Sequence, residues 1–289
     1  MINIGNFQIS RNSDVFFIAE IGINHNGSLE NVEKLVKECK EAGANAVKFQ
    51  KRTINEVYTK AELEKPRESV FGKTNGDLKR GLEFSYEDYH KIDNICKSQN
   101  IIWFASCWDE ESVNFIDKFE VPCYKIASAS LTDKKLLEFT KSKNRPILLS
   151  SGMSTLDEID KAINVLDKDK LVLMHSTSSY PCKTEELNLN VIKFFKDKYQ
   201  EIPIGYSGHE VGLSTTLCAA ALGATVIERH VTLDRSMWGS DQSASIEIHG
   251  LKNLIRDIRV FEKAAGDGRK KVYETEVPII KKLRRKNTI

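Results

Sequence analysis

The chain has 289 residues, of which 40% are hydrophobic and 29% are charged, and its formal net charge is +2. This composition is that of an ordinary globular protein, and the length suffices for one full-sized domain with a large core. The small net charge gives no reason to expect a nucleic-acid partner. No apolar stretch approaches the length of a membrane span, and the N-terminus lacks the basic and then apolar segments of a signal peptide. We therefore expect no contact with a membrane.

Six cysteines are scattered along the chain without a CxxC pair or a regular spacing. Several of them fall within predicted strands or helices, where a reduced cysteine packs as a small hydrophobic side chain. We therefore expect free thiols and a cytoplasmic protein. Cys107 stands at the end of a predicted strand, where a reactive thiol is an alternative, but the sequence shows no histidine partner for it.

Eight short apolar runs follow an extended segment at residues 2–10, which we expect to form a hairpin that closes the lower end of the fold. Each run has the β-branched and aromatic content of a strand buried on both faces. Nearly every run stops at a residue that can take part in chemistry. The runs are VFFIAE (15–20), AVKFQ (46–50), IIWFAS (101–106), YKIAS (124–128), PILLSS (146–151), LVLMHS (171–176), IPIGYSGH (202–209) and TVIERH (225–230).

Amphipathic helical patterns lie between most of these runs. Thr155 and Glu158 have the spacing of a capping box at the start of one of them. The alternation predicts eight βα units, and thus an α/β protein with a (β/α)8 or TIM barrel. The expected helices cover residues 29–42, 86–98, 133–142, 155–166, 187–199, 212–223 and 251–265.

Two segments do not fit this alternation of strands and helices. Residues 51–84 show no clear periodicity and are long for a βα loop, so we expect an irregular loop over the catalytic face. Its basic residues favour closure over an anionic substrate, whereas its acidic residues equally fit a solvated insertion. At the other end, residues 281–289 form a basic tail, and we expect the barrel to occupy residues 1–280.

The active site of a TIM barrel lies at the carboxyl ends of its strands, so the polar ends of the runs are the candidate site. His209 and His230 end successive strands, and two imidazoles facing one ion leave positions for water and substrate oxygens. The alternative is that each histidine is a hydrogen-bonded residue at a strand end.

Lys48 and Lys125 are a second group of candidate site residues, because a lysine within a buried strand is rare unless it is paired or functional. Together with hydroxyl groups at neighbouring strand ends they suit a substrate that carries a carboxylate and a phosphate. A Schiff base on Lys125 and a structural ion pair between Lys48 and Glu20 remain alternatives. Glu20 is a candidate general acid or base, and Asp241 is a candidate for holding sugar hydroxyls. The hydroxyl groups belong to Ser106, Ser128, Ser150 and Ser207.

Eight sequence motifs are spread over essentially the whole chain. They are AEIGINHNG, KFQK, GKTNGDLKRGLEFS, YKIAS, SSGMS, STSSYP, IGYSGHE and ERHVTLDRSMWGSDQSASIE. Together they resemble the sialic acid synthase family. The resemblance implies an N-acetylneuraminate synthase-like enzyme that condenses phosphoenolpyruvate with N-acetylmannosamine or its 6-phosphate and releases phosphate. Two alternatives remain. The acceptor could be another sugar, such as mannose 6-phosphate or a diacetamido-hexose, or the barrel could bind sugar or phosphoenolpyruvate without catalysis.

The resemblance also assigns roles to individual residues. It implies that Glu20 is catalytic, that His209 and His230 bind a divalent metal, most often Mn²⁺ with Mg²⁺ or Co²⁺ possible, and that Tyr180 and Asp241 lie near the sugar. The residues that correspond to the phosphoenolpyruvate-binding positions are Lys48, Ser106, Lys125, Ser128, Ser150 and Ser207.

This chain departs from the family's pattern at two places. Ser130 replaces an acid that contacts the sugar in many bacterial members, so the acceptor or its orientation is open. The small C-terminal antifreeze-like domain of the full-length family, which supplies an arginine to a neighbouring subunit, is expected to be absent. A homodimer remains possible because the helices of a barrel can pair.

Overall fold

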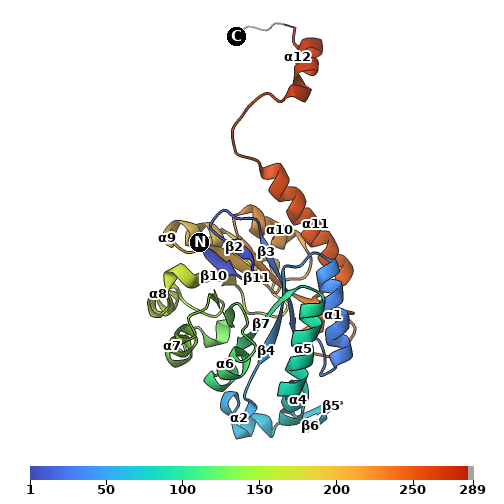
Figure 1. The fold of residues 1–289 in the computed structure, drawn as a ribbon, viewed down its shortest axis with the longest axis vertical. Coiled ribbons are helices and arrows are strands. Elements are labelled where there is room, and N and C mark those ends of the chain that lie inside the picture. The colour runs from blue at the N-terminus through green and yellow to red at the C-terminus, as the bar shows by residue number, and fades with distance from the viewer. Residues whose placement is uncertain (286–289) are drawn as a thin grey trace.

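The computed structural model describes residues 1–285 and contains the predicted TIM barrel (Figure 1). The barrel strands are parallel and follow one another around the ring in chain order, and the pairing of the last strand with both its predecessor and the first strand closes it. The strands are β3 (Phe16–Gly22), β4 (Ala46–Lys51), β7 (Ile102–Cys107), β8 (Tyr124–Ile126), β9 (Ile147–Ser150), β10 (Leu171–Ser176), β11 (Ile204–Gly208) and β12 (Val226–Thr232).

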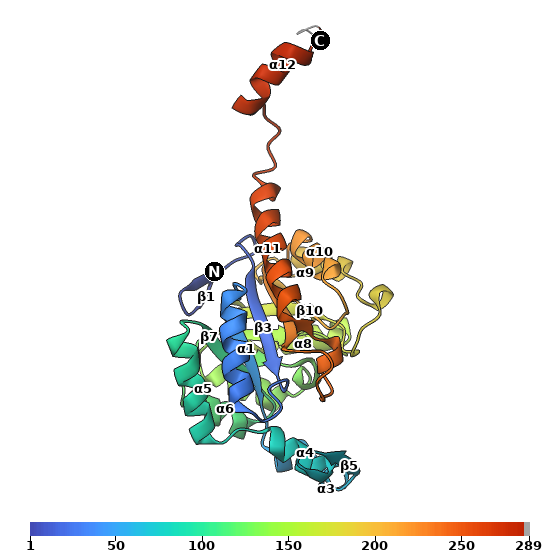
Figure 2. The same ribbon diagram turned by 90° about the vertical axis from the view of Figure 1, so that its right-hand side faces the viewer.

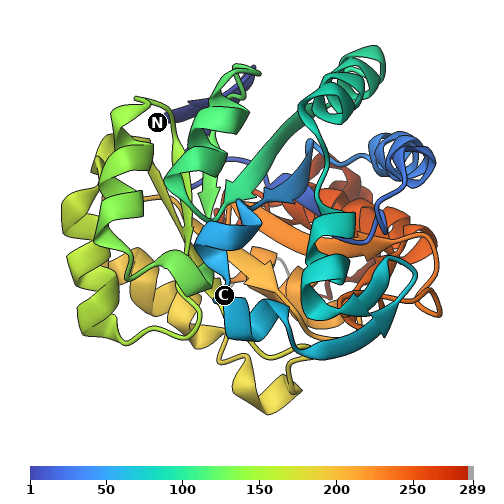
Figure 3. The same cartoon turned by 90° about the horizontal axis from the view of Figure 1, so that it is seen from below.

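A ring of helices covers the strands from outside, and each packs through an apolar face (Figure 3). In the first of them Val32, Leu35, Val36 and Cys39 are buried, as the sequence pattern predicted. The strands are buried on both faces because side chains fill the barrel interior and helices cover its exterior. The helices are α1 (Leu29–Glu41), α5 (Tyr86–Ser98), α6 (Glu110–Asp117), α7 (Lys134–Ser142), α8 (Leu156–Val165), α9 (Asn190–Lys198), α10 (Ser214–Ala221) and α11 (Ile248–Ala265).

The helix starts depend on local capping. Thr155 and Glu158 form the predicted capping box of α8. Helix α6 was not predicted, because its eight residues carry too short an apolar pattern, yet Asp109 caps it by accepting a hydrogen bond from the Ser112 amide.

The N-terminal hairpin is confirmed and lies at the amino ends of the barrel strands (Figure 1). Its strands β1 (Ile2–Ile4) and β2 (Phe7–Ile9) pair antiparallel. Gly5 makes the turn with a φ of +59°, and a Cβ atom there would stand 2.7 Å from Cδ1 of Ile102 at the start of β7. The positive φ therefore favours glycine, and the contact with Ile102 seats the hairpin at the amino ends of the barrel strands.

The expectation of an irregular loop over residues 51–84 was wrong, because this segment is largely structured. Its strands form a small antiparallel hairpin, and its last helix begins with a capping box between Thr74 and Asp77 that was readable in the sequence. The segment lies at the carboxyl ends of the barrel strands, as expected (Figure 2). Its elements are α2 (Ile54–Val57), α3 (Lys60–Leu63), β5 (Pro66–Ser69), β6 (Gly72–Thr74) and α4 (Asn75–Leu82).

The chain leaves the barrel after α11, on the side opposite to the β5–β6 hairpin (Figure 2). The short helix α12 (Val277–Leu283) follows, so the boundary expected at residue 280 falls inside a helix. Val277, Ile279 and Leu283 are exposed on it. Of the expected basic tail, residues 286–289 lie outside the described residues. Within residues 1–285, no helix combines the length and the apolar character that crossing a membrane needs.

Candidate functional site

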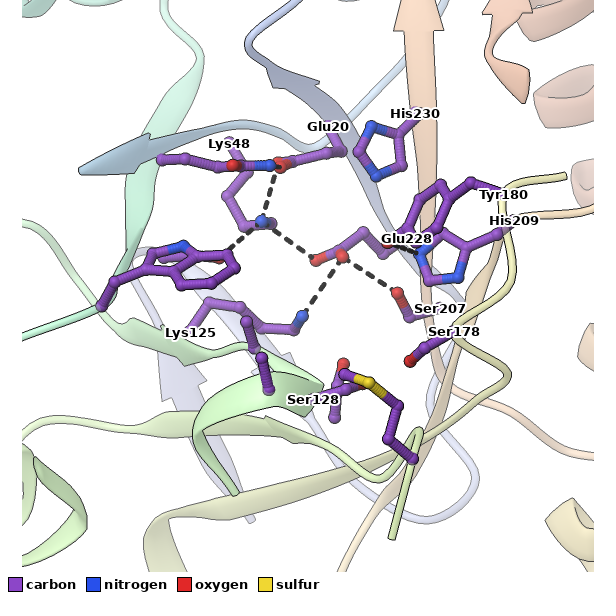
Figure 4. A pocket seen from close by; sticks show the side chains of 17 residues that line it. Glu20, Lys48, Lys125, Ser128, Ser178, Tyr180, Ser207, His209, Glu228 and His230 are labelled. Atoms are coloured by element: carbon purple, nitrogen blue, oxygen red, sulfur yellow. Dashed lines mark hydrogen bonds and ion pairs between the residues drawn. The ribbon is translucent and has the colours of Figure 1, made fainter. Parts of the chain in front are cut away.

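The polar strand ends meet in one cavity of about 150 Å³ at the carboxyl end of the barrel (Figure 4). The strand register explains the meeting, because Glu20 is level with Lys48 on one side and with His230 on the other. Side chains that are level on neighbouring parallel strands point to the same face, here into the barrel. The predicted residues that line the cavity are Glu20, Lys48, Ser106, Lys125, Ser128, Ser150, Tyr180, Ser207, His209 and His230.

Asp241 and Ser130, the two other residues that the sequence analysis connected with the sugar, do not line this cavity. Asp241 lies just beyond it, with its Oδ2 atom 3.8 Å from Nδ1 of His230. Ser130 is buried at the end of a 3-10 turn over Ser128–Ser130.

The Lys48 ammonium group contacts side chains of both neighbouring strands, β3 and β7. Its Nζ atom lies 2.8 Å from Oε2 of Glu20 and 2.7 Å from Oγ of Ser106, and all three side chains are buried. Gln50 donates a hydrogen bond of 3.0 Å to the other oxygen of Glu20. The ion pair between Lys48 and Glu20 is thus present, and the hydrogen-bond network places it inside the cavity.

Glu228 is the central residue that the sequence reasoning did not assign to the site. Its Oε1 accepts hydrogen bonds from Lys125 at 3.2 Å and from Ser207 at 3.0 Å, and its Oε2 lies 3.9 Å from the Lys48 ammonium (Figure 4). The sequence contained evidence that Glu228 faces the site. Glu228 and His230 are two positions apart on one strand, and residues at this spacing face the same side.

The two carboxyl groups differ in their pKa values because their neighbours differ. Burial raises the pKa of Glu20 to about 7, because the ammonium group of Lys48 only partly offsets burial and the nearby charge of Glu228 adds to it. Burial acts on Glu228 in the same direction, but Lys125 and Lys48 together hold its pKa at about 2. Burial and the neighbouring Lys48 lower the pKa of Lys125, which the attraction of Glu228 partly offsets. The site thus holds one carboxylate and one carboxyl group that can exchange a proton near neutral pH.

Glu210 and Arg229 neighbour the two histidines in the sequence but face the helix layer. Arg229 forms a buried ion pair of 3.0 Å with Glu210, which also accepts hydrogen bonds from Tyr206 and Thr216. Glu210 therefore serves the structure, and of the acids beside the histidines only Glu228 enters the cavity.

The serine hydroxyls retain capacity for a ligand. Oγ of Ser150 is buried and has no hydrogen-bond partner within residues 1–285. Ser128 accepts a hydrogen bond of 3.1 Å from the Gly152 amide, which leaves its own O–H free to donate. A buried hydroxyl without a partner is costly, so these donors favour an anionic ligand. Gln50, Trp108, Met153 and Ser178 also line the cavity, and the sequence reasoning assigned no role to them.

His209 and His230 face each other with ring centroids 5.6 Å apart. Nδ1 of His209 donates to the Thr177 carbonyl at 2.7 Å, so Nε2 carries the lone pair, to which Tyr180 donates at 2.8 Å. Burial and the neighbouring His230 lower the pKa of His209 to about 3, and burial lowers that of His230. Both rings are therefore neutral, as a metal ligand must be.

The donor set fits a metal held by two histidines. Nδ1 of His230 is buried without a hydrogen-bond partner inside the described part of the chain. Residues 1–285 contain no cluster of three or more His, Cys, Asp or Glu side chains arranged around one point. An ion bound here would complete its coordination with water and substrate oxygens.

A reactive thiol at Cys107 is disfavoured. Its sulfur is buried and donates to the Ser112 carbonyl at 3.6 Å, and burial raises the pKa of the thiol above its ordinary value. All six cysteines are free, and only Cys218 is exposed.

Comparison with known proteins gives one consistent result. The sequence model described as the NeuB family matches residues 35–270. N-acetylneuraminate-9-phosphate synthase of Homo sapiens is 38% identical over 272 residues, which cover 93% of this chain and 76% of that protein. N,N'-diacetyllegionaminic acid synthase of Legionella pneumophila is 36% identical over 285 residues, with 95% and 80% covered.

A solved structure is similar over nearly the full length. The N-acetylneuraminic acid (sialic acid) synthetase of Leptospira borgpetersenii serovar Hardjo-bovis, in complex with citrate, superposes with a TM-score of 0.85 at 32% identity. The match covers 99% of this chain and 98% of that one. With the family match, these relatives and this barrel, the chain belongs to the NeuB family, the sialic acid synthase family that its motifs predicted.

Proposed function

We propose that the protein is a nonulosonate synthase that condenses phosphoenolpyruvate with N-acetylmannosamine or its 6-phosphate and releases inorganic phosphate. The observation that carries the proposal is a single cavity that brings Lys48, Lys125 and serine hydroxyls together with the pair of histidines. One of these hydroxyls, that of Ser150, is buried without a hydrogen-bond partner within residues 1–285. One wall suits an anion, and the other suits a polarisable carbonyl oxygen.

The cationic wall matches the charges of phosphoenolpyruvate. This substrate carries a carboxylate and a phosphate on the same carbon, C2, and both need charge-assisted hydrogen bonds when they leave water. Lys48 and Lys125 supply the cations, and Ser106, Ser128 and Ser150 supply hydroxyl donors. Glu228 holds both ammonium groups in place before the substrate arrives, since it contacts each of them.

The histidine wall suits the aldehyde of the open-chain sugar. His209 and His230 would hold Mn²⁺, Mg²⁺ or Co²⁺, and such an ion supplies Lewis-acid polarisation of the carbonyl. Tyr180 lies against His209 at this wall, and Asp241 lies beyond His230, so both are placed to orient the sugar hydroxyls.

Glu20 is the group that we assign to proton transfer. In the reaction a bond forms between C3 of phosphoenolpyruvate and C1 of the sugar, and the aldehyde oxygen takes a proton. Water adds its hydroxyl to C2 and releases a proton. The C2–O bond to phosphate then breaks while the C2 hydroxyl gives its proton to the departing phosphate, which leaves the 2-keto acid and inorganic phosphate. With a pKa of about 7, Glu20 can carry the proton from the water to the aldehyde oxygen.

A diacetamido-hexose is the second candidate acceptor. The identity to the Legionella N,N'-diacetyllegionaminic acid synthase, 36%, is nearly that to the human relative, 38%. The two candidates share the phosphoenolpyruvate chemistry and differ in the substituents of the sugar.

The test is release of phosphate from phosphoenolpyruvate with a panel of acceptors, with and without Mn²⁺. The panel contains N-acetylmannosamine, its 6-phosphate, mannose 6-phosphate and a diacetamido-hexose. Release with one acceptor, together with the mass of the keto acid formed, identifies the substrate. Absence of release with every acceptor under both conditions would overturn the proposal in favour of a barrel that only binds these ligands.

A further inference from the structure

A second cavity of about 710 Å³ lies at the rim of the barrel, between the segment that follows β4 and the loop that follows β12. Its walls combine cationic and hydrogen-bonding side chains with aromatic and aliphatic ones. The polar residues that face it include Asn26, Arg67, Ser69, Lys79 and Ser240, and Trp238 contributes an aromatic wall.

Two connections place the rim cavity next to the reaction cavity. Ser240 lines it, and the next residue, Asp241, places Oδ2 3.8 Å from Nδ1 of His230. On the facing side, Arg52 donates a hydrogen bond to Gln50, which lines the reaction cavity. A sugar with its aldehyde at the histidines would therefore extend past Asp241 toward the rim cavity.

Within the described part of the chain, two of the cations at this rim have no acidic partner within 4.0 Å. On the same segment Lys65 pairs with Glu62, and Arg80 lies 3.8 Å from Asp77. In contrast, no carboxylate of residues 1–285 lies within 4.0 Å of the head group of Arg67 or Lys79. Glu68 also lines the cavity, and both it and Arg67 are exposed, so solvent screens their charges, whereas Lys79 is half-buried.

The surroundings of Lys79 make an anion favourable there. Its side chain is half-buried, and its Nζ atom lies 5.2 Å from the centroid of the Tyr58 ring. Burial lowers the pKa of its ammonium group, and the positive charges of Arg52 and Arg67 lower it further, while the more weakly acting Asp241 and Glu62 raise it. Like charges held together in a partly dry cavity repel each other, and a bound anion removes that cost.

We infer that the rim cavity binds a phosphate monoester carried by the acceptor sugar at the end remote from its aldehyde, with Arg67 and Lys79 as the recognition residues. This inference rests on the proposed function and decides between its acceptors in favour of the hexosamine 6-phosphate. The carbon count agrees with it. Because C1 of the acceptor becomes C4 of the product, the acceptor's C6 becomes C9, the position of the phosphate in the name of the human relative.

The experiment compares kcat/KM for N-acetylmannosamine 6-phosphate and for N-acetylmannosamine in the full-length enzyme and in single variants. The wild-type enzyme should prefer the phosphorylated sugar, because Arg67 and Lys79 have no anion to bind when the sugar lacks the phosphate. Lys79→Gln and Arg67→Gln should each lower the preference about tenfold, the size of one lost charge-assisted contact. Lys73→Gln removes a lysine of the same segment that does not line the cavity, and it should retain the wild-type preference.

Several results would overturn the inference. The wild-type enzyme could use both sugars equally well, or Lys79→Gln could lower kcat/KM for both by the same factor. A rise in the KM for phosphoenolpyruvate with either sugar would show instead that the cations guide that substrate inward. These outcomes differ from failure of the proposed function, in which no acceptor releases phosphate at all.

Discussion

The hydroxyl of Tyr180 donates a hydrogen bond to Nε2 of His209 across 2.8 Å, and this nitrogen is the only one of the ring left to bind a metal. The other nitrogen, Nδ1, is held by the Thr177 carbonyl at 2.7 Å. Tyr180 and a metal ion therefore compete for one lone pair, and the phenol must turn away when an ion binds.

The first prediction follows from this competition. Tyr180→Phe should bind Mn²⁺ several-fold more tightly than the wild-type protein, because the ion no longer displaces a hydrogen bond worth about 1 kcal/mol. Titration followed by the electron paramagnetic resonance of free Mn²⁺ measures the affinity. Tyr199→Phe, which removes a hydroxyl bound to Asp160 far from the site, is the matched control. Equal or weaker binding by Tyr180→Phe would show that the phenol does not compete.

The second prediction concerns the histidine pair itself. His209→Ala should abolish metal-dependent turnover. It should leave the fold intact, because the His209 side chain lines the cavity and does not belong to the hydrophobic core. Phosphate release and the thermal midpoint are measured together. His249→Ala, at an exposed position of α11, should behave as the wild-type protein does. Wild-type activity in His209→Ala would mean that the assignment of the metal site is wrong.

The third prediction separates anion binding from imine chemistry at Lys125. Lys125→Met should weaken the binding of phosphoenolpyruvate, and borohydride should trap no adduct on the wild-type enzyme. The variant should also lose about 3 kcal/mol of stability, because Glu228 remains buried without its nearer partner. Exposed Lys134→Met serves as the control.

A double variant keeps this prediction testable if the single variant unfolds. Lys125→Met combined with Glu228→Gln should regain much of the stability, since no buried charge is left unpaired, but it should not regain phosphoenolpyruvate binding. Recovery of binding, or a pyruvyl adduct on Lys125 in the wild-type enzyme, contradicts the assignment.

The fourth prediction uses the raised pKa of Glu20. Because its pKa is about 7 in the folded protein and near 4.5 when unfolded, the folded state binds more protons between these values. The contribution of Glu20 to stability is therefore complete below pH 4.5 and is lost as pH rises through about 7. Glu20→Gln should gain stability relative to the wild-type protein between pH 5 and pH 8, by about 3 kcal/mol.

Urea unfolding of both proteins at several pH values measures this difference. The comparison isolates Glu20, because the buried histidines, whose pKa values are lowered, titrate in both proteins and cancel. A difference in stability that does not change with pH would show that the Glu20 carboxyl group stays ionised throughout.

The sequence alone determined the barrel and most of its site. Hydrophobic runs such as residues 15–20 and 225–230 are local, and the alternation of strands and helices admits few closed arrangements. Once the barrel is assumed, strand polarity brings Glu20, Lys48, Lys125 and the histidines to one end, and the structure confirms that they share a cavity.

Only the tertiary structure decided which neighbours in the sequence enter that cavity. Glu228 points inward to both lysines, whereas Glu210, even closer to a histidine along the chain, pairs with Arg229 in the helix layer. The same holds for the rim, where the absence of an acidic partner for Lys79 within residues 1–285 depends on distances between separate loops. Such contacts depend on strand register, loop paths and burial, which join residues far apart in the chain, and no local pattern carries that information.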